Sequence, residues 1–154
     1  MAECEKAIIT ALCMIYKDNK ILLQDRLKED WRGITFPGGH IEKEESFVQG
    51  IKREVEEETG LTIHNPKICG IKQFQTEHDE RYIVLLFKTD EFEGEVISSD
   101  EGEMIWIERE NLLDYSLVDD FMELLSVFDN ENINEIMYER HEANKDFEWI
   151  IKLY

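Results

Sequence analysis

Hydrophobic residues run almost without interruption through positions 7–16 and again through 21–24. Such runs are typical of buried strands, and the polar, turn-forming residues 17–19 between them predict a hairpin. A third short strand is predicted over 34–37, where the run ends at a proline followed by two glycines. Residues 81–89 predict another buried strand.

The hydrophobic period changes from that of a strand to that of a helix after residue 46. Ser46 and Gln49 have the spacing of a capping box, and Gly60 suits the position that follows a helix C-terminus. These signals predict a helix over 47–59. A second helix is predicted over 118–128, where apolar residues recur at the helical period.

The rest of the pattern predicts a mixed α/β (α+β) domain. No repeat, linker or low-complexity segment divides the chain, so residues 1–154 are expected to form a single domain. The remaining predicted elements are extended stretches over 61–75 broken at Pro66 and Gly70, a hairpin loop at 76–80, a strand over 104–107, a helical turn over 109–114, and a terminal hairpin made of 136–141 and 147–154.

Charge restricts the partners. The 154 residues include 36 acidic and 17 basic side chains, which gives a formal net charge of −19 and argues against binding to nucleic-acid polymers or anionic membranes. A small polyphosphate could still bind if metal cations supplied positive charge. Cys4, Cys13 and Cys69 show no metal-ligand spacing, and no signal peptide or membrane span is evident, so we expect a cytoplasmic protein with reduced thiols.

Four glutamates, at positions 54, 56, 57 and 58, crowd the first predicted helix. At 100° per residue, Glu54, Glu57 and Glu58 fall together beside the apolar stripe, whereas Glu56 points away. Like charges at this spacing repel by a few tenths of a kcal/mol per pair. A bound Mg²⁺ would cancel that repulsion, although glutamate runs are more often simply solvated helix faces.

The same helix is expected to pack on the sheet through Val48, Ile51 and Val55. Gly50 lies on the side of Glu54 and Glu57, at an interior position where glycine costs about 1 kcal/mol relative to alanine. Its missing side chain is expected to leave room for a ligand.

The spacing over residues 39–61 resembles the Nudix box, G-x5-E-x7-R-E-U-x-E-E-x-G-U, in which U is an aliphatic residue. A match of this length should arise by chance on the order of once in a million such sequences. The resemblance implies the Nudix fold, a mixed β-sheet sandwiched between helices. The matching residues are Gly39, Glu45, Arg53, Glu54, Val55, Glu57, Glu58, Gly60 and Leu61.

The resemblance also implies a metal-dependent hydrolase that cleaves a diphosphate linked to another moiety, with Mg²⁺ as the cofactor and Mn²⁺ as a substitute. The implied metal ligands are the Gly38 carbonyl, Glu54, Glu57 and Glu58, completed by Glu101 or, in reserve, Glu103. Glu54 is the preferred general base, with Glu57 or the region of Glu101 as alternatives. Arg53 and Glu45 are expected to hold the loop and orient the helix, and Gly39 and Gly60 to have structural roles.

The flanking sequence WRGITFPGGHIE resembles the MutT-like branch of this family, which includes oxidised purine nucleoside triphosphatases that release the monophosphate and pyrophosphate. Residues 117–121 are similar to the acidic segment by which some of those enzymes read an oxidised purine. Asp119 or Asp120 is therefore a candidate to bind a purine edge, although paired aspartates before a helix are often only caps.

Other residues outside the box are weaker candidates for substrate contacts. Arg26, at the end of the second strand, could contact a phosphate or be an ordinary surface arginine. Phe74 or Trp31 could form an apolar wall for a base. His40 and His78 are expected to be solvated or hydrogen-bonded, and the Phe and Tyr residues of the tail are expected to belong to the core.

Two alternatives to a purine nucleoside triphosphatase remain open at this level. One is a different Nudix substrate, such as a nucleotide sugar or a dinucleoside polyphosphate. The other is a Nudix domain that binds a nucleotide and regulates without turnover, which the intact set of carboxylates argues against. In each case the partner is a small nucleotide, and the chain is expected to be a monomer or a homodimer.

Overall fold

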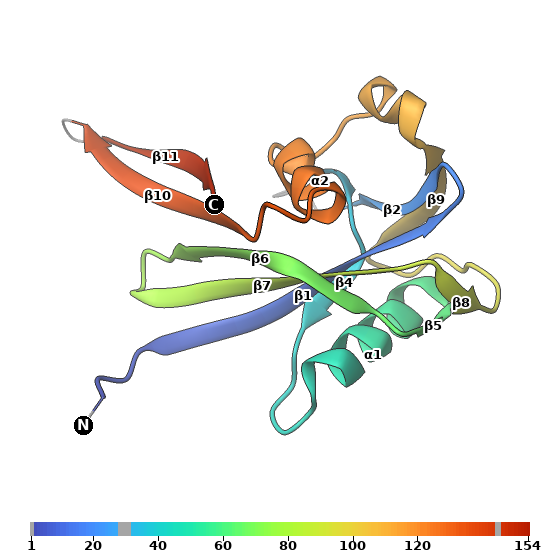
Figure 1. The fold of residues 1–154 in the computed structure, drawn as a ribbon, viewed down its shortest axis with the longest axis horizontal. Coiled ribbons are helices and arrows are strands. Elements are labelled where there is room, and N and C mark those ends of the chain that lie inside the picture. Colours follow the sequence, from blue (N-terminus) through green and yellow to red (C-terminus); the bar gives the residue numbers. More distant parts are fainter. Residues whose placement is uncertain (1, 28–31, 144–145) are drawn as a thin grey trace.

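Two helices, α1 (Phe47–Thr59) and α2 (Phe121–Asp129), lie on opposite sides of a strongly twisted mixed sheet (Figure 1). The computed structural model describes residues 2–27, 32–143 and 146–154. The other elements are β1 (Lys6–Lys17), β2 (Lys20–Arg26), β3 (Gly33–Thr35), β4 (Gly38–His40), β5 (Thr62–His64), β6 (Lys67–Gln75), β7 (Glu80–Thr89), β8 (Glu91–Glu93), β9 (Gly102–Glu108), the 3₁₀-helix η1 (Arg109–Asp114), β10 (Glu135–Ala143) and β11 (Asp146–Leu153).

The long strand β1 organises the sheet. The strands lie in the order β11-β10-β6-β7-β1-β2-β3, and β9 pairs with β2 on its other side. β1 runs parallel to β7 along most of its length, while its end pairs with β2 and its middle, at Thr10–Leu12, pairs with β4. The first glycines of the sequence motif are thereby fixed against the centre of the sheet.

The unbroken apolar runs reflect burial on both faces of the sheet, as expected of strands covered on two sides. Side chains alternate along β1, so Ala11, Cys13 and Ile15 pack in the cluster on the α1 side, whereas Met14 packs in the cluster on the α2 side. The predicted hairpin of β1 and β2 and the predicted strand β7 are confirmed.

The predicted bounds of α1 are confirmed at both ends. The Ser46 hydroxyl accepts a hydrogen bond from the Gln49 amide, and the Gln49 side chain reaches back to the Ser46 amide, which completes the capping box. Gly60 ends the helix in the left-handed region, with φ of 80°.

The predicted faces of α1 need two corrections. Ile51 and Val55 are fully buried, but Val48 is 41% exposed and lies outside the apolar contact with the sheet. Gly50 does not make room for a ligand, because a Cβ there would lie 2.6 Å from Ile41 Cδ1 and 2.9 Å from Glu45 Oε1. The glycine instead lets the preceding loop pack closely on the helix.

The predicted start of the second helix was three residues too early. α2 begins at Phe121 because the backbone before it is paired with β3. The Val118 amide donates to the Ile34 carbonyl, and Leu117 forms an isolated parallel β-bridge with Ile34. The extended pairing therefore overrides the helical period at these residues. Asp120 becomes the N-cap residue.

Most of the other predicted elements are present. The helical turn over 109–114 and the terminal hairpin are confirmed, and the break expected at Gly70 appears as a shift of register in β6. The short strands β4, β5 and β8 were not predicted as such. No helix in the described part of the chain is long and apolar enough to cross a membrane.

Candidate active site

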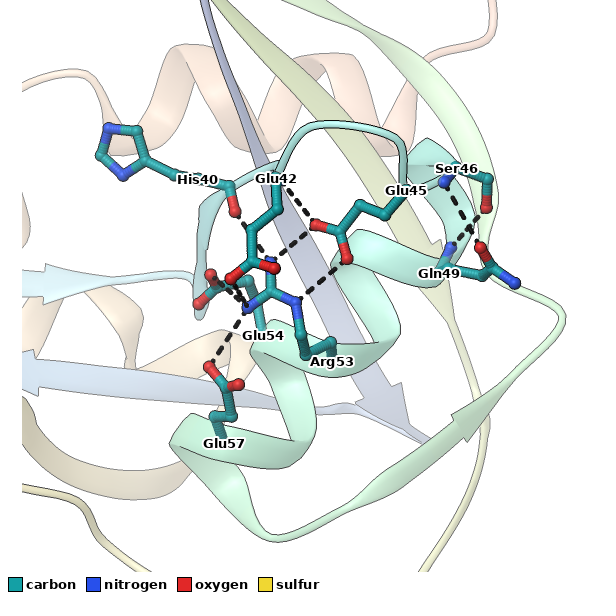
Figure 2. Close-up of polar contacts among 8 residues, drawn as sticks. All are labelled: His40, Glu42, Glu45, Ser46, Gln49, Arg53, Glu54 and Glu57. Carbon is teal, nitrogen blue, oxygen red and sulfur yellow. Dashed lines mark hydrogen bonds and ion pairs between the residues drawn. The ribbon is translucent and has the colours of Figure 1, made fainter.

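Arg53 of α1 is the centre of a polar network that ties the helix to the loop before it (Figure 2). Its guanidinium donates to both oxygens of Glu45, at 3.1 Å from Nε and 2.7 Å from Nη2, and Nη2 also donates to the His40 carbonyl at 3.0 Å. This hydrogen bonding lowers the pKa of Glu45 to about 2. The geometry suits the loop-holding role expected of Glu45 and Arg53.

The second amino group of Arg53 faces two of the helix glutamates. Nη1 donates to Glu54 Oε1 at 2.9 Å and to Glu57 Oε2 at 3.2 Å. The mutual repulsion expected among the glutamates is thus partly offset by an internal cation. Glu57 has a side chain that is 60% exposed, and it is not among the described residues that line the adjacent cavity.

A cavity of about 640 Å³ opens between the motif and α2. Three of the predicted metal-site carboxylates, those of Glu54, Glu58 and Glu101, line one end of it together with the glycines of β4. Glu103 is exposed and is not among the described lining residues. Of the two residues considered for completing the site, the structure therefore places Glu101 beside the others.

Glu58 is the most deeply placed of these carboxylates. It is 6% exposed, and its Oε2 accepts a hydrogen bond from the Gly38 amide at 2.9 Å. Burial raises the pKa of Glu58 to about 8, and a hydrogen bond with Glu101 adds to the shift. Burial also raises the pKa of Glu54, against the opposing effect of Arg53. Both shifts have the same cause, since a carboxylate that has lost its water is less stable in the charged form.

The two glycines of β4 let backbone and carboxylates approach each other. A Cβ on Gly38 would lie 2.0 Å from the Ala11 carbonyl oxygen, so no other residue fits at this crossing of β4 and β1. A Cβ on Gly39 would lie 2.3 Å from Glu54 Oε2. The space that another side chain would fill is occupied by the carboxylate of Glu54.

The donor set fits a hard divalent cation, because it consists of carboxylate oxygens beside a backbone segment, and hard cations prefer oxygen ligands. Among the described residues, no three His, Cys, Asp or Glu side chains are yet gathered round one point as metal ligands. Binding would therefore draw Glu54, Glu58 and Glu101 closer together, with the cation displacing the proton of Glu58.

The opposite end of the cavity is aromatic and contains one ion pair. Phe74 stacks on Tyr82 with ring centroids 5.1 Å apart, and Trp149 of the C-terminal hairpin meets Phe74 edge-on at 5.9 Å. All three rings line the cavity. Phe74 is thus placed as the predicted apolar wall, whereas Trp31 lies outside the described residues.

Asp120 is 4% exposed and does not cap α2 with its side chain. Its Oδ2 instead accepts hydrogen bonds from Lys72 Nζ and from the Tyr138 hydroxyl. Asp119 is exposed and lines the same cavity. The structure therefore brings both predicted aspartates to the cavity, at the end away from the carboxylates of α1.

Four cavity residues were missed by the sequence analysis or assigned differently. Neither Lys72 nor Gln24 carries a distinct signal, since β6 also contains Lys67, Gln73 and Gln75. Tyr138 was expected to belong to the core with the other Phe and Tyr residues of the tail, and no role was predicted for Trp149. Arg26, the predicted phosphate contact, lines the cavity at the end of β2, and His40 lies at its rim.

The chain is similar to known proteins over most of its length. The model of the NUDIX domain matches residues 6–126. The chain belongs to the Nudix family. Members of this family generally need a divalent metal ion, and the mixed sheet between helices is the Nudix fold.

Individual relatives agree with this assignment. An uncharacterised Nudix hydrolase of Bacillus subtilis is 31% identical over 61% of this chain and 61% of its own length. An 8-oxo-dGTP diphosphatase of Haemophilus influenzae is 31% identical over 70% of this chain and 82% of its own length. A MutT protein from Bacillus halodurans has a similar structure, with a TM-score of 0.74 and 26% identity over 95% of this chain and 97% of that one.

The matches to the first curated relatives are partial, spanning 61% and 54% of their lengths. The names of other relatives refer to different substrates, ADP-ribose and CTP. Family membership therefore leaves the substrate of this chain to be argued from its own cavity.

Proposed function

We propose that the protein is a Mg²⁺-dependent pyrophosphohydrolase that cleaves a purine nucleoside triphosphate, ordinary or oxidised, to the monophosphate and pyrophosphate. The observation that carries this proposal is that a single cavity has three carboxylates, including the buried Glu58, at one end and an aromatic, hydrogen-bonding surface at the other. The first end suits a metal-bound polyphosphate, and the second suits a flat base.

Glu54, Glu58, Glu101 and the Gly38 carbonyl are the groups proposed to hold the cation, and Mn²⁺ should substitute for Mg²⁺. When bound, the metal ion neutralises phosphate oxygens and lowers the pKa of bound water. Glu57 joins this set only if it leaves Arg53, to which it is hydrogen-bonded.

Glu54 is proposed as the general base, since it lies at the cavity wall and is held by Arg53 Nη1 at 2.9 Å. The contact opposes the effect of burial and favours the ionised form that accepts a proton. Glu101 is the alternative within the cavity, and the exposed position of Glu57 makes it the weaker choice. Arg26 is proposed to contact a phosphate, and Asp119 or Asp120 the base.

Other Nudix substrates, such as nucleotide sugars and dinucleoside polyphosphates, remain alternatives, as does a domain that binds a nucleotide without turnover. The carboxylates in the cavity argue against the last of these. Burying Glu58 costs stability, and binding alone would not require Glu54 and Glu101 to line the same cavity.

The test is to incubate the protein with ordinary and oxidised nucleoside triphosphates, nucleotide sugars and dinucleoside polyphosphates, with Mg²⁺ or with EDTA, and to identify products by chromatography. We expect pyrophosphate and a purine monophosphate only with the metal. Glu58→Gln should abolish turnover, whereas Glu56→Gln, the same change on the exposed side of α1, should not. Absence of turnover of every compound would favour the binding domain.

A further inference from the structure

Lys72 is an unusual residue to find at the base end of this cavity. It is 8% exposed, and its ammonium lies 2.5 Å from Asp120 Oδ2, 4.7 Å from the centre of the Tyr138 ring and 5.9 Å from that of Phe74. An ammonium on a flexible stem is costly to bury, even when paired. Both Lys72 and Asp120 line the cavity, so the pair is positioned to meet a ligand.

A purely structural role explains the pair poorly. Asp120 is the N-cap residue of α2, yet its carboxylate does not accept a hydrogen bond from the helix. Replacing a buried ion pair by apolar residues is often neutral or stabilising, so packing alone does not call for one here. The Asp120 carboxylate instead accepts hydrogen bonds from Lys72 and Tyr138.

The pair still has hydrogen-bonding capacity for a ligand. The bonds from Lys72 and Tyr138 both end on Oδ2 of Asp120, and the helix does not use Oδ1. An ammonium carries three hydrogens, of which one is directed at Asp120. The pair thus offers an acceptor oxygen and a charged donor next to each other.

The position of Lys72 points to the base of the substrate. Lys72 pairs with Val84, Val84 with Thr10, and Thr10 with His40, so three strand spacings of about 4.8 Å separate Lys72 from β4. The polyphosphate belongs at the β4 end, beside the carboxylates. The aromatic rings round Lys72 suit a flat heterocycle.

We propose that Lys72 determines base specificity: its ammonium donates to a carbonyl oxygen of the base, beside the N–H group that Asp120 accepts. The substrate class is then an oxo base with a lactam edge, as in guanine, hypoxanthine and 8-oxoguanine. Adenine places an amino group where guanine has this carbonyl, so two donors would face each other. The inference rests on the proposed function for the identity of the ligand as a nucleotide.

Binding without turnover tests the inference separately from catalysis. In EDTA, titration calorimetry should show that the wild-type protein binds GMP about 10- to 100-fold more tightly than 2-aminopurine riboside monophosphate, which lacks the 6-oxo group, or AMP, because a hydrogen bond from a charged donor is lost. Lys72→Met should reduce this preference about 10-fold, to the part that comes from the N–H group accepted by Asp120, which AMP and 2-aminopurine also lack. Lys67→Met, on the same strand but outside the cavity, should retain the full preference.

Lys72→Met leaves the Asp120 carboxylate buried without its cation, so the variant Lys72→Met/Asp120→Asn provides a second form without the buried charge. An undiminished preference for GMP in either folded variant would overturn the inference, as would equal binding of the three monophosphates by the wild type. If the preference is found but no triphosphate is hydrolysed with Mg²⁺, the inference stands and the proposed hydrolase activity fails. If triphosphates are hydrolysed but the wild type binds the three monophosphates equally, the proposed hydrolase activity stands and the inference about Lys72 fails.

Discussion

The backbone amide of Gly38 donates to Glu58 Oε2 at 2.9 Å, across twenty residues of sequence. The contact joins the glycine just before the motif to the last glutamate of the motif and holds a buried carboxylate against the cavity. A single amide does not compensate for the water that Glu58 has lost, and the pKa of this group stays raised to about 8.

The raised pKa predicts how the stability of the metal-free protein depends on pH. Because folded Glu58 retains its proton up to about pH 8 whereas the unfolded chain releases it near pH 4.5, this group's contribution to stability is lost as the pH rises between these values. We expect the free energy of unfolding in EDTA to fall by about 1–3 kcal/mol from pH 5 to pH 8.5. Urea denaturation at several pH values measures this.

Two comparisons check that Glu58 is the cause. Glu58→Gln carries no titrating proton and should flatten the decline, whereas Glu56→Gln should leave it unchanged. Saturating Mg²⁺ should raise the stability at pH 8 more than at pH 5, since protons compete with the cation. A decline that persists in Glu58→Gln would assign the effect to other groups.

Arg53 is predicted to matter for both stability and activity. Arg53→Lys keeps the charge but cannot reproduce the forked contact with Glu45 together with the bond to the His40 carbonyl. The loss should lower the free energy of unfolding by about 1–3 kcal/mol and the kcat more than 10-fold, because the loop that carries β4 is released. Chemical denaturation and steady-state kinetics measure the two effects.

The matched control is Lys52→Arg, a change of the opposite kind at the preceding helix position. It should leave both quantities within error. If Arg53→Lys kept the kcat of the wild type, the hydrogen bonds of Arg53 would contribute to stability but not to catalysis.

Gly39→Ala is predicted to separate activity from stability. Its Cβ would lie 2.3 Å from Glu54 Oε2, the mobile end of a side chain, so Glu54 should move while the backbone keeps its course. We expect a loss of kcat of about 10-fold or more with a change of less than about 1 kcal/mol in the free energy of unfolding. Gly38→Ala, which meets the Ala11 carbonyl oxygen instead, should be strongly destabilising. Similar stability losses in both variants would contradict this distinction.

The part of the site that could be predicted from sequence is the part whose signals are local. The capping box, the C-terminal glycine and the spacing of the glutamates all lie within residues 39–61, and the structure has α1 at the expected bounds. The start of α2 was predicted wrongly because it depends on the pairing of Val118 with Ile34, which are far apart in sequence. Lys72 was missed for the same reason, since its partner Asp120 lies 48 residues away.

Gln24 offers a test of how far the cavity is built for a ligand. The residue is 3% exposed and lines the cavity, and its Nε2 has no hydrogen-bond partner among the described residues. A buried donor without an acceptor costs about 1–3 kcal/mol, so Gln24→Met, of similar size, should raise the free energy of unfolding by about 1 kcal/mol in the absence of nucleotide. Urea denaturation measures this gain.

The same variant should bind nucleotide more weakly, because the donor that is idle in the free protein is then missing when a ligand oxygen enters. We expect calorimetry to show an affinity for GMP reduced about 5- to 30-fold, with stability moving in the opposite direction. Gln75→Met, which removes an amide already bonded to Asp79 outside the cavity, should gain no stability and keep its affinity. A less stable Gln24→Met would mean that the amide has a partner in the folded protein, and unchanged affinity would mean that the ligand does not reach it.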